Sequence, residues 1–292
     1  MNKIKDRWSN LLLECDKYNN SKSHIPNIIP PRHNPYVSIV IPCINYHFTK
    51  EYFRPCLDSI FNGTIIPNEI IIVVSFIKKD EFNIRWNKIN KYNFYNNFKI
   101  IYISQLLSCG EARQKGIELS YKDSEIVIFC DADDVYHRQR IEVIIHFFKT
   151  YDIKVINHLF IPDTYSFDDY VIDKIPILSD SETIYNHYFP DKTFKPFCQQ
   201  SEKYYGQYLN KTITDGHMAI KLPIDMKFEN KTVNCDSDFL YRLCYRYKKN
   251  LIIGACLSKY TKALEWLKND PTKKIELYNS LLDCQSYSIK YI

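Results

Sequence analysis

The sequence predicts an α/β fold with a doubly wound sheet, and three observations indicate it. Short apolar runs rich in β-branched residues alternate with segments of helical periodicity along the first half of the chain. The run EIVIFC at 125–130 lacks polar alternation, which is typical of a strand buried on both faces of a parallel sheet. It ends abruptly in Asp131, Asp133 and Asp134, where an open α/β sheet presents side chains to a ligand.

The composition excludes several classes of protein. The 292 residues are 45% hydrophobic and 25% charged, as in ordinary globular proteins, with room for one large domain and appendages. The net charge of +5 is spread along the chain, and without any recognition motif for DNA or RNA we expect no nucleic-acid partner. No run approaches the roughly 18 apolar residues of a membrane span, and the N-terminus lacks a signal-peptide core. We therefore expect a cytoplasmic protein whose ten cysteines, none in a C-x-x-C pair, are free thiols.

Hydrophobic periodicity locates the elements of the first half. The expected strands cover residues 37–41, 70–75, 99–103, 126–130 and 154–160, and the expected helices cover 53–61 and 138–151. A further helix begins after Ser108, which forms with Glu111 the signature of a capping box. The Asn- and Lys-rich stretch 78–97 is compatible with either a helix or a loop.

The second half carries weaker signals. Residues 165–208 are rich in Asp, Tyr and Pro and are expected to be irregular. A strand is expected after the turn that ends at His217, and a helix after 234–238. We expect an arm over 1–34 with a helix around 7–18, a main domain over 35–258, and a tail of two amphipathic helices over 259–292.

The acidic motif that follows the central strand predicts a cation site. Carboxylates as close in sequence as Asp131, Asp133 and Asp134 repel one another unless a cation lies between them. Mg²⁺ and Mn²⁺ prefer oxygen ligands and commonly bind one or two carboxylates together with substrate phosphates. The alternative is a solvated acidic turn, which often follows a strand.

Arg113, in the helix before the acidic strand, is a candidate phosphate ligand. An arginine near a helix N-terminus offers a forked donor to phosphate oxygens. The alternative interpretation is a surface arginine that pairs with Glu111 or Glu118 of the same helix.

Five stretches form a pattern through their order and spacing. They are VSIVIPCIN at 37–45, PNEIIIVV at 67–74, GEARQKGIELS at 110–120, IVIFCDADDVYHRQRIE at 126–142 and CDSDFLYR at 235–242. Together they resemble an inverting family 2 glycosyltransferase with the GT-A fold, which is a mixed, doubly wound α/β fold that uses nucleotide sugars. The resemblance extends from about residue 37 to residue 246.

The resemblance implies a donor site at the strand ends for a nucleoside-diphosphate sugar, with a UDP-sugar as the default. The implied donor-binding residues are Pro42, Cys43, Asn45, Ser75, Arg113, Asp131, Ala132 and Asp133. Within this set, Asp133 and Asp131 of the D-x-D motif would hold a Mn²⁺ or Mg²⁺ ion that bridges the phosphates.

The resemblance also implies the chemistry. Asp236 would act as general base on an acceptor hydroxyl of a glycan, protein or lipid, and a hexosyl group would move in a single in-line displacement with inversion. His217, Gly216 and Asp238 would lie near the acceptor. The alternatives are that Asp236 and Asp238 only cap their helix, and that His217 is a turn residue bonded to backbone.

The chain departs from the family pattern at several positions. Ser75 stands where the second strand usually ends in an aspartate that reads the base, Arg138 replaces a common proline, and Cys235 replaces a glutamate. No histidine follows His217 to complete a metal shell. Two other hypotheses are a non-catalytic protein that binds nucleotide sugars, and a haloacid-dehalogenase-type phosphatase, whose D-x-D-x-[TV] pattern matches residues 131–135.

Overall fold

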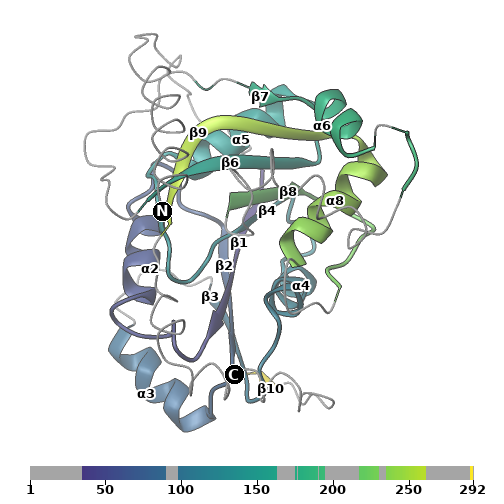
Figure 1. The fold of residues 1–292 in the computed structure, drawn as a ribbon. Coiled ribbons are helices and arrows are strands. Elements are labelled where there is room, and N and C mark those ends of the chain that lie inside the picture. Colours follow the sequence, from purple (N-terminus) through teal and green to yellow (C-terminus); the bar gives the residue numbers. More distant parts are fainter. Residues whose placement is uncertain are drawn as a thin grey trace, which may run out of the picture.

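The computed structural model describes residues 35–89, 98–162, 175, 177–189, 191–194, 217–229, 235–260 and 290–291. Over these residues the chain forms a mixed sheet with the strand order β10-β3-β2-β1-β4-β8-β6-β9-β5, while β7 pairs with β9 (Figure 1). Helices α2, α3 and α5 pack on one face, and α4, α6 and α8 on the other. The predicted doubly wound mixed sheet is confirmed.

The first strands form the parallel centre of the sheet. They are β1 (Val37–Ile44), β2 (Glu69–Ser75), β3 (Phe98–Ile103) and β4 (Ile126–Phe129). Strand β1 pairs in parallel with both β2 and β4. All residues of β2 and β4 are buried because helices cover both faces, which explains why their sequences lack polar alternation.

Pro42 lies inside β1, yet its missing N–H breaks no bond between described strands. Successive residues of a parallel strand bond alternately to the neighbour on either side. Asn45 N donates to Ser75 O on the β2 side, and the last bond on the β4 side joins Cys130 N to Val40 O. Pro42 therefore faces the β4 side just beyond the end of β4, where no ladder donor is needed.

The second half of the chain extends the sheet. Its strands are β5 (Val135–Tyr136), β6 (Val155–Pro162), β7 (Ile177–Ser179), β8 (Met218–Lys221), β9 (Asn250–Tyr260) and β10 (Lys290–Tyr291). Strand β8 runs antiparallel to β4 and β6, and β9 runs parallel to β6. The long strand β9 was not predicted, and Lys259 and Tyr260 belong to it and not to a helical tail.

The helices largely follow their predicted positions. They are α2 (Phe53–Phe61), α3 (Lys79–Ile89), α4 (Cys109–Leu119), α5 (Arg140–Thr150), α6 (Ser181–Tyr188) and α8 (Cys235–Tyr247). The capping box of α4 is confirmed: Ser108 Oγ accepts from Glu111 N, and Glu111 Oε2 accepts from Ser108 N at 2.9 Å. Helix α6 and strand β7 lie in the region 165–208, which is therefore not wholly irregular.

Several expectations fall outside the described residues, among them the arm 1–34 and most of the predicted tail, 261–289. Within the described part of the chain, Cys43, Cys56, Cys109, Cys130 and Cys244 are free thiols, as expected. No helix in that part combines the length and the apolar character that crossing a membrane requires.

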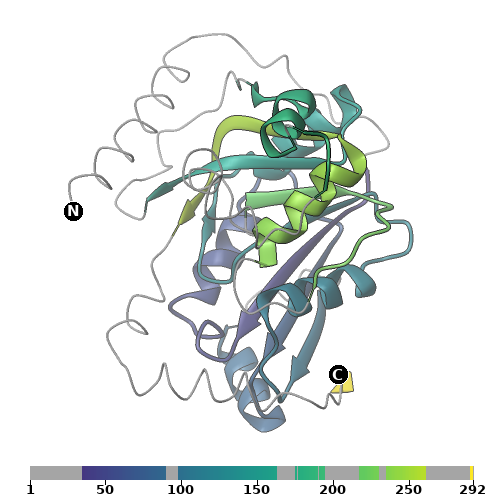
Figure 2. The ribbon, with the colours of Figure 1, turned by 45° about the vertical axis from the view of Figure 1, so that its right-hand side comes forward.

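Gly116 sets how closely α4 approaches the sheet. A Cβ atom at this position would overlap both Cγ atoms of Val40 in β1. Helix α4 can therefore lie directly on β1, beside α8 in both views (Figures 1 and 2). This close packing brings Arg113, one turn earlier in α4, toward the end of the central strands.

We expect Gly116→Ala to lower the free energy of unfolding by about 1–3 kcal/mol, because the added methyl overpacks a rigid contact. Urea denaturation measures this change. The double variant Gly116→Ala/Val40→Ala should cost less than the sum of the two single changes, since removing the Val40 methyls makes room. Strict additivity would show that the clash is relieved elsewhere.

Candidate functional site

The acidic motif leaves the sheet at a topological switch point. The chain passes from β1 to β2 on one side and later enters β4 on the other side of β1. Open α/β sheets bind ligands at such a point, outside the carboxyl ends of the strands. Asp131 and Asp133 are partly accessible there, whereas Ala132 and Asp134 are buried.

Arg113 forms an ion pair with Asp131. Its Nη2 atom donates to Asp131 Oδ1, and only 2% of the Arg113 side chain is exposed. The alternative of a surface arginine is therefore wrong, because Glu111 closes the capping box and Glu118 contacts Lys115 and Gln114. A buried guanidinium beside an acidic motif is suited to bind a substrate anion.

Asp133 lies in an environment that suits a cation. Burial, together with the neighbouring Asp131 and Asp134 carboxylates, raises the pKa of Asp133 to about 8. A positive ion would favour its charged form. Among the described residues, no set of three His, Cys, Asp or Glu side chains could hold a metal alone. The cation would therefore need substrate oxygens, as Mg²⁺ and Mn²⁺ sites commonly do.

His217 packs behind the motif. It is fully buried, its Nε2 atom lies 3.5 Å from Asp134 Oδ2, and its ring stacks on Phe160 at 4.6 Å between centroids. Burial lowers the pKa of His217 to about 3, so the imidazole is neutral. Its predicted neighbour Gly216 lies outside the described residues.

The late acidic residues lie at the start of α8. Asp238 is 4% exposed and accepts from Arg242 Nε at 2.8 Å, one turn further along the helix. Asp236 is the second residue of α8, but its side chain lies outside the described part of the structure. Its role as general base remains a prediction.

The nucleotide end of the predicted site gathers at the ends of β1, β2 and β3. Cys43 and Ser75 are buried, and Asn45 N donates to Ser75 O at 3.0 Å. Phe76, which follows Ser75, has φ of 59°, a left-handed conformation that is strained for a bulky residue. Asn45 Oδ1 and Gln105 Oε1 are buried without a hydrogen-bond partner among the described residues, which leaves acceptors for a ligand or water.

Sequence reasoning missed Arg85 of α3. Its Nη1 atom donates to Asn45 O at 2.8 Å, and its Nη2 atom donates to Glu81 Oε1 at 2.6 Å. Arg85 thus holds the loop after β1 from outside the five matching stretches. The sequence around Arg85, residues 78–97, showed only an Asn- and Lys-rich composition and no motif that would indicate this role.

Sequence reasoning also missed Arg140, which bonds to the residues directly before the acidic motif and so holds the motif in place. The buried guanidinium donates to Phe129 O at 2.7 Å, to Cys130 Sγ at 2.8 Å and to His158 Nε2 at 2.9 Å. It stacks on the ring of Tyr136, whose hydroxyl donates to Asp131 O at 2.9 Å. Arg140 of α5 thereby links His158 of β6 and Tyr136 of β5 to the end of β4, which leads into the acidic motif.

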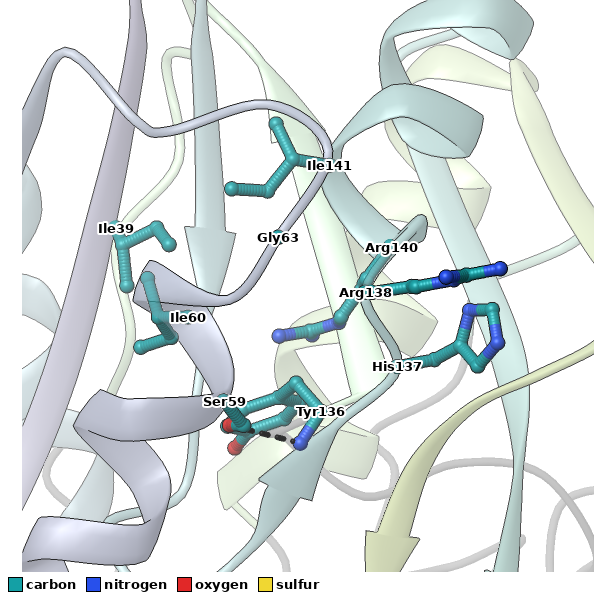
Figure 3. Close-up of a pocket in the computed structure, with 9 residues that line it drawn as sticks. All are labelled: Ile39, Ser59, Ile60, Gly63, Tyr136, His137, Arg138, Arg140 and Ile141. Carbon is teal, nitrogen blue, oxygen red and sulfur yellow. Dashed lines mark hydrogen bonds between the residues drawn. The ribbon is translucent and has the colours of Figure 1, made fainter. Parts of the chain in front are cut away.

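A small cavity lies beside these contacts, between the end of α2 and the start of α5 (Figure 3). Ile39, Ile60 and Ile141 contribute apolar lining, and Tyr136 N donates to Ser59 Oγ at 3.0 Å. None of the predicted donor-binding residues lines this cavity. We therefore do not assign it to the candidate site.

Comparison with known families identifies the chain. The model of glycosyl transferase family 2 matches residues 38–222, more than half of the sequence. The chain belongs to this family. The family and the position of the motif after the fourth strand leave no support for the phosphatase hypothesis.

Solved structures support the GT-A fold. The structure of S. aureus TarS 1–349 in complex with UDP-GlcNAc matches with a TM-score of 0.51 and 14% identity, covering 77% of this chain and 58% of that chain. A second structure of TarS 1–349 gives a TM-score of 0.52 and 12% identity, covering 85% of this chain and 70% of that one. The chain thus spans little more than half of the first of these relatives. No curated protein sequence matches the chain.

We expect Arg140→Ala to lower the free energy of unfolding by about 3 kcal/mol or more, because three buried acceptors lose a charged donor. Arg140→Lys should lower the free energy of unfolding by an intermediate amount, because an ammonium group cannot reproduce the planar, forked set of N–H donors of the guanidinium. Arg138→Ala is the matched control: that side chain is exposed and points away from Arg140 (Figure 3), so about 0.5 kcal/mol or less is expected. Equal urea midpoints for Arg140→Ala and Arg138→Ala would contradict the role of Arg140 in holding the motif.

We expect the metal-free protein to lose stability as the pH rises, because of Asp133. Its folded pKa of about 8 lies above the value of 3.8 for a free carboxyl, so the folded state keeps a proton that the unfolded chain has lost. The unfolding free energy therefore falls with pH in this window, by up to about 1.4 kcal/mol per pH unit.

Denaturation in chelator between about pH 6.5 and 7.5 isolates this effect. In that range His47 and His217 are neutral in the folded state but partly protonated in the unfolded chain, which adds a slope of opposite sign that all variants share. The comparison between variants therefore reports Asp133: Asp133→Asn should remove its falling contribution to the slope, whereas Asp152→Asn, at an exposed ion pair with Lys249, should keep it. An unchanged slope in Asp133→Asn would contradict the assignment.

Proposed function

We propose that the protein is a metal-dependent, inverting glycosyltransferase. It moves a sugar from a nucleoside-diphosphate donor, a UDP-sugar by default, to a hydroxyl of a glycan, protein or lipid. The observation that carries this proposal is the ion pair of the buried Arg113 with Asp131, beside Asp133, at the switch point of a family 2 chain. The match to a TarS structure that contains UDP-GlcNAc supports UDP as the first nucleotide to test.

Asp133, with Asp131, holds the divalent cation. The raised pKa of Asp133 and the crowding of three carboxylates support this assignment, since a cation removes both costs. A bound cation supplies neutralisation of the charge that develops on the leaving diphosphate. Arg113 contributes a second, fixed positive charge on the same side.

Asp236 takes the proton from the acceptor hydroxyl. Its place in the first turn of α8 supports this role, because the helix N-terminus stabilises the ionised carboxylate that a base requires. Attack from the face opposite the diphosphate then inverts the anomeric carbon in one step. His217, Gly216 and Asp238 would lie near the acceptor.

A thermal-shift panel tests the proposal. UDP-, GDP-, CMP- and dTDP-sugars are compared, each with Mn²⁺ and with chelator. A donor at a hundred times its dissociation constant should add about 2.7 kcal/mol to stability, and only when metal is present. Silence across the panel with and without metal would overturn the metal-dependent transferase.

Two aspartate variants separate an enzyme from a binding protein. Asp133→Asn should lose the metal-dependent donor shift, whereas Asp236→Asn should keep it and lose release of nucleoside diphosphate in the presence of simple glycoside acceptors. Asp152→Asn, in an exposed ion pair, is the control and should retain both. Donor binding without measurable turnover in the unaltered protein would favour the non-catalytic hypothesis.

A further inference from the structure

His47 lies on a loop that is firmly held. The loop leaves β1 in a turn, in which His47 N donates to Ile44 O at 2.9 Å. The next residue, Phe48, is fully buried and stacks on Phe82 of α3 at 5.3 Å between ring centroids. Arg85 donates to Asn45 O just before it. The His47 backbone therefore has little freedom, and its side chain is presented from a fixed position.

The His47 imidazole is aimed at Asp133. Only 12% of the side chain is exposed, and Nε2 lies 3.8 Å from Asp133 Oδ2. Nε2 is buried and has no hydrogen-bond partner among the described residues. At 3.8 Å the two atoms are too far apart for a direct hydrogen bond. Buried polar atoms are almost always satisfied, so this nitrogen, which is aimed toward Asp133, faces a position that something else fills.

We propose that His47 Nε2 is a further protein ligand of the divalent cation and binds it beside Asp133 Oδ2. Bonds from such ions to nitrogen and oxygen are about 2.0–2.2 Å long, so two ligands of one ion lie at most about 4.4 Å apart. The separation of 3.8 Å falls within that reach. This inference rests on the proposed metal-dependent function and names the ligand set of its cation.

A nitrogen ligand has a consequence for metal choice. Mg²⁺ prefers an all-oxygen shell, whereas imidazole is a common ligand of transition metals. A site that adds an imidazole to its carboxylates should therefore favour Mn²⁺ over Mg²⁺. If His47 only held the loop, its replacement would weaken the binding of Mn²⁺ and Mg²⁺ equally.

Pulsed EPR of Mn²⁺ bound with inorganic pyrophosphate tests the ligand directly, whichever nucleotide the protein uses. The unaltered protein should show hyperfine coupling to a histidine nitrogen, which changes when histidine is labelled with ¹⁵N. The coupling should vanish in His47→Ala and persist in His146→Ala, the matched control at an exposed position of α5.

Affinity provides the second readout. His47→Ala should bind Mn²⁺ at least about tenfold more weakly, the smallest loss seen when even an outer partner of a metal ligand is removed. Its Mg²⁺ affinity should change less. Bound Mn²⁺ without nitrogen coupling, or coupling that survives in His47→Ala, would overturn this inference alone. Failure to bind Mn²⁺ would overturn metal dependence with it.

Discussion

Three carboxylates stand within four residues at the end of a buried strand, and each is accommodated by a different part of the chain. Asp131 pairs with Arg113 of α4, Asp133 faces His47 of the loop after β1, and Asp134 faces His217 at the start of β8. Only the first of these partners is a fixed cation. Burial, together with the remaining repulsion, raises the pKa of Asp133, and the divalent cation proposed above would offset both costs.

The rest of the fold holds this arrangement in place. Gly116 lets α4 lie against β1, so that Arg113 reaches the strand ends. Arg140 links the end of β4, directly before the motif, to His158 of β6. Phe48, buried against α3, holds the loop that carries His47. Much of the packing around the motif thus determines where charged groups lie, which is what electrostatic catalysis requires.

Strong local signals predicted much of this structure. The apolar runs of β1, β2 and β4, the capping box of α4 and the inward face of α5 were all readable, because periodicity and capping involve residues that are close in sequence. Strand β9 was missed, although it is long, because its parallel partner β6 lies far away in the chain. Arg140 and Arg85 were missed because a sequence does not show which arginines bond to residues in other elements.

The sequence by itself determined the fold class, the family and the acidic motif at the end of a central strand. Each of these depends on residue types in a fixed order. The tertiary structure alone decided that Arg113 is buried on Asp131 and that His47 faces Asp133. These contacts join separate elements across the sheet, and burial and distance arise only when the chain has packed.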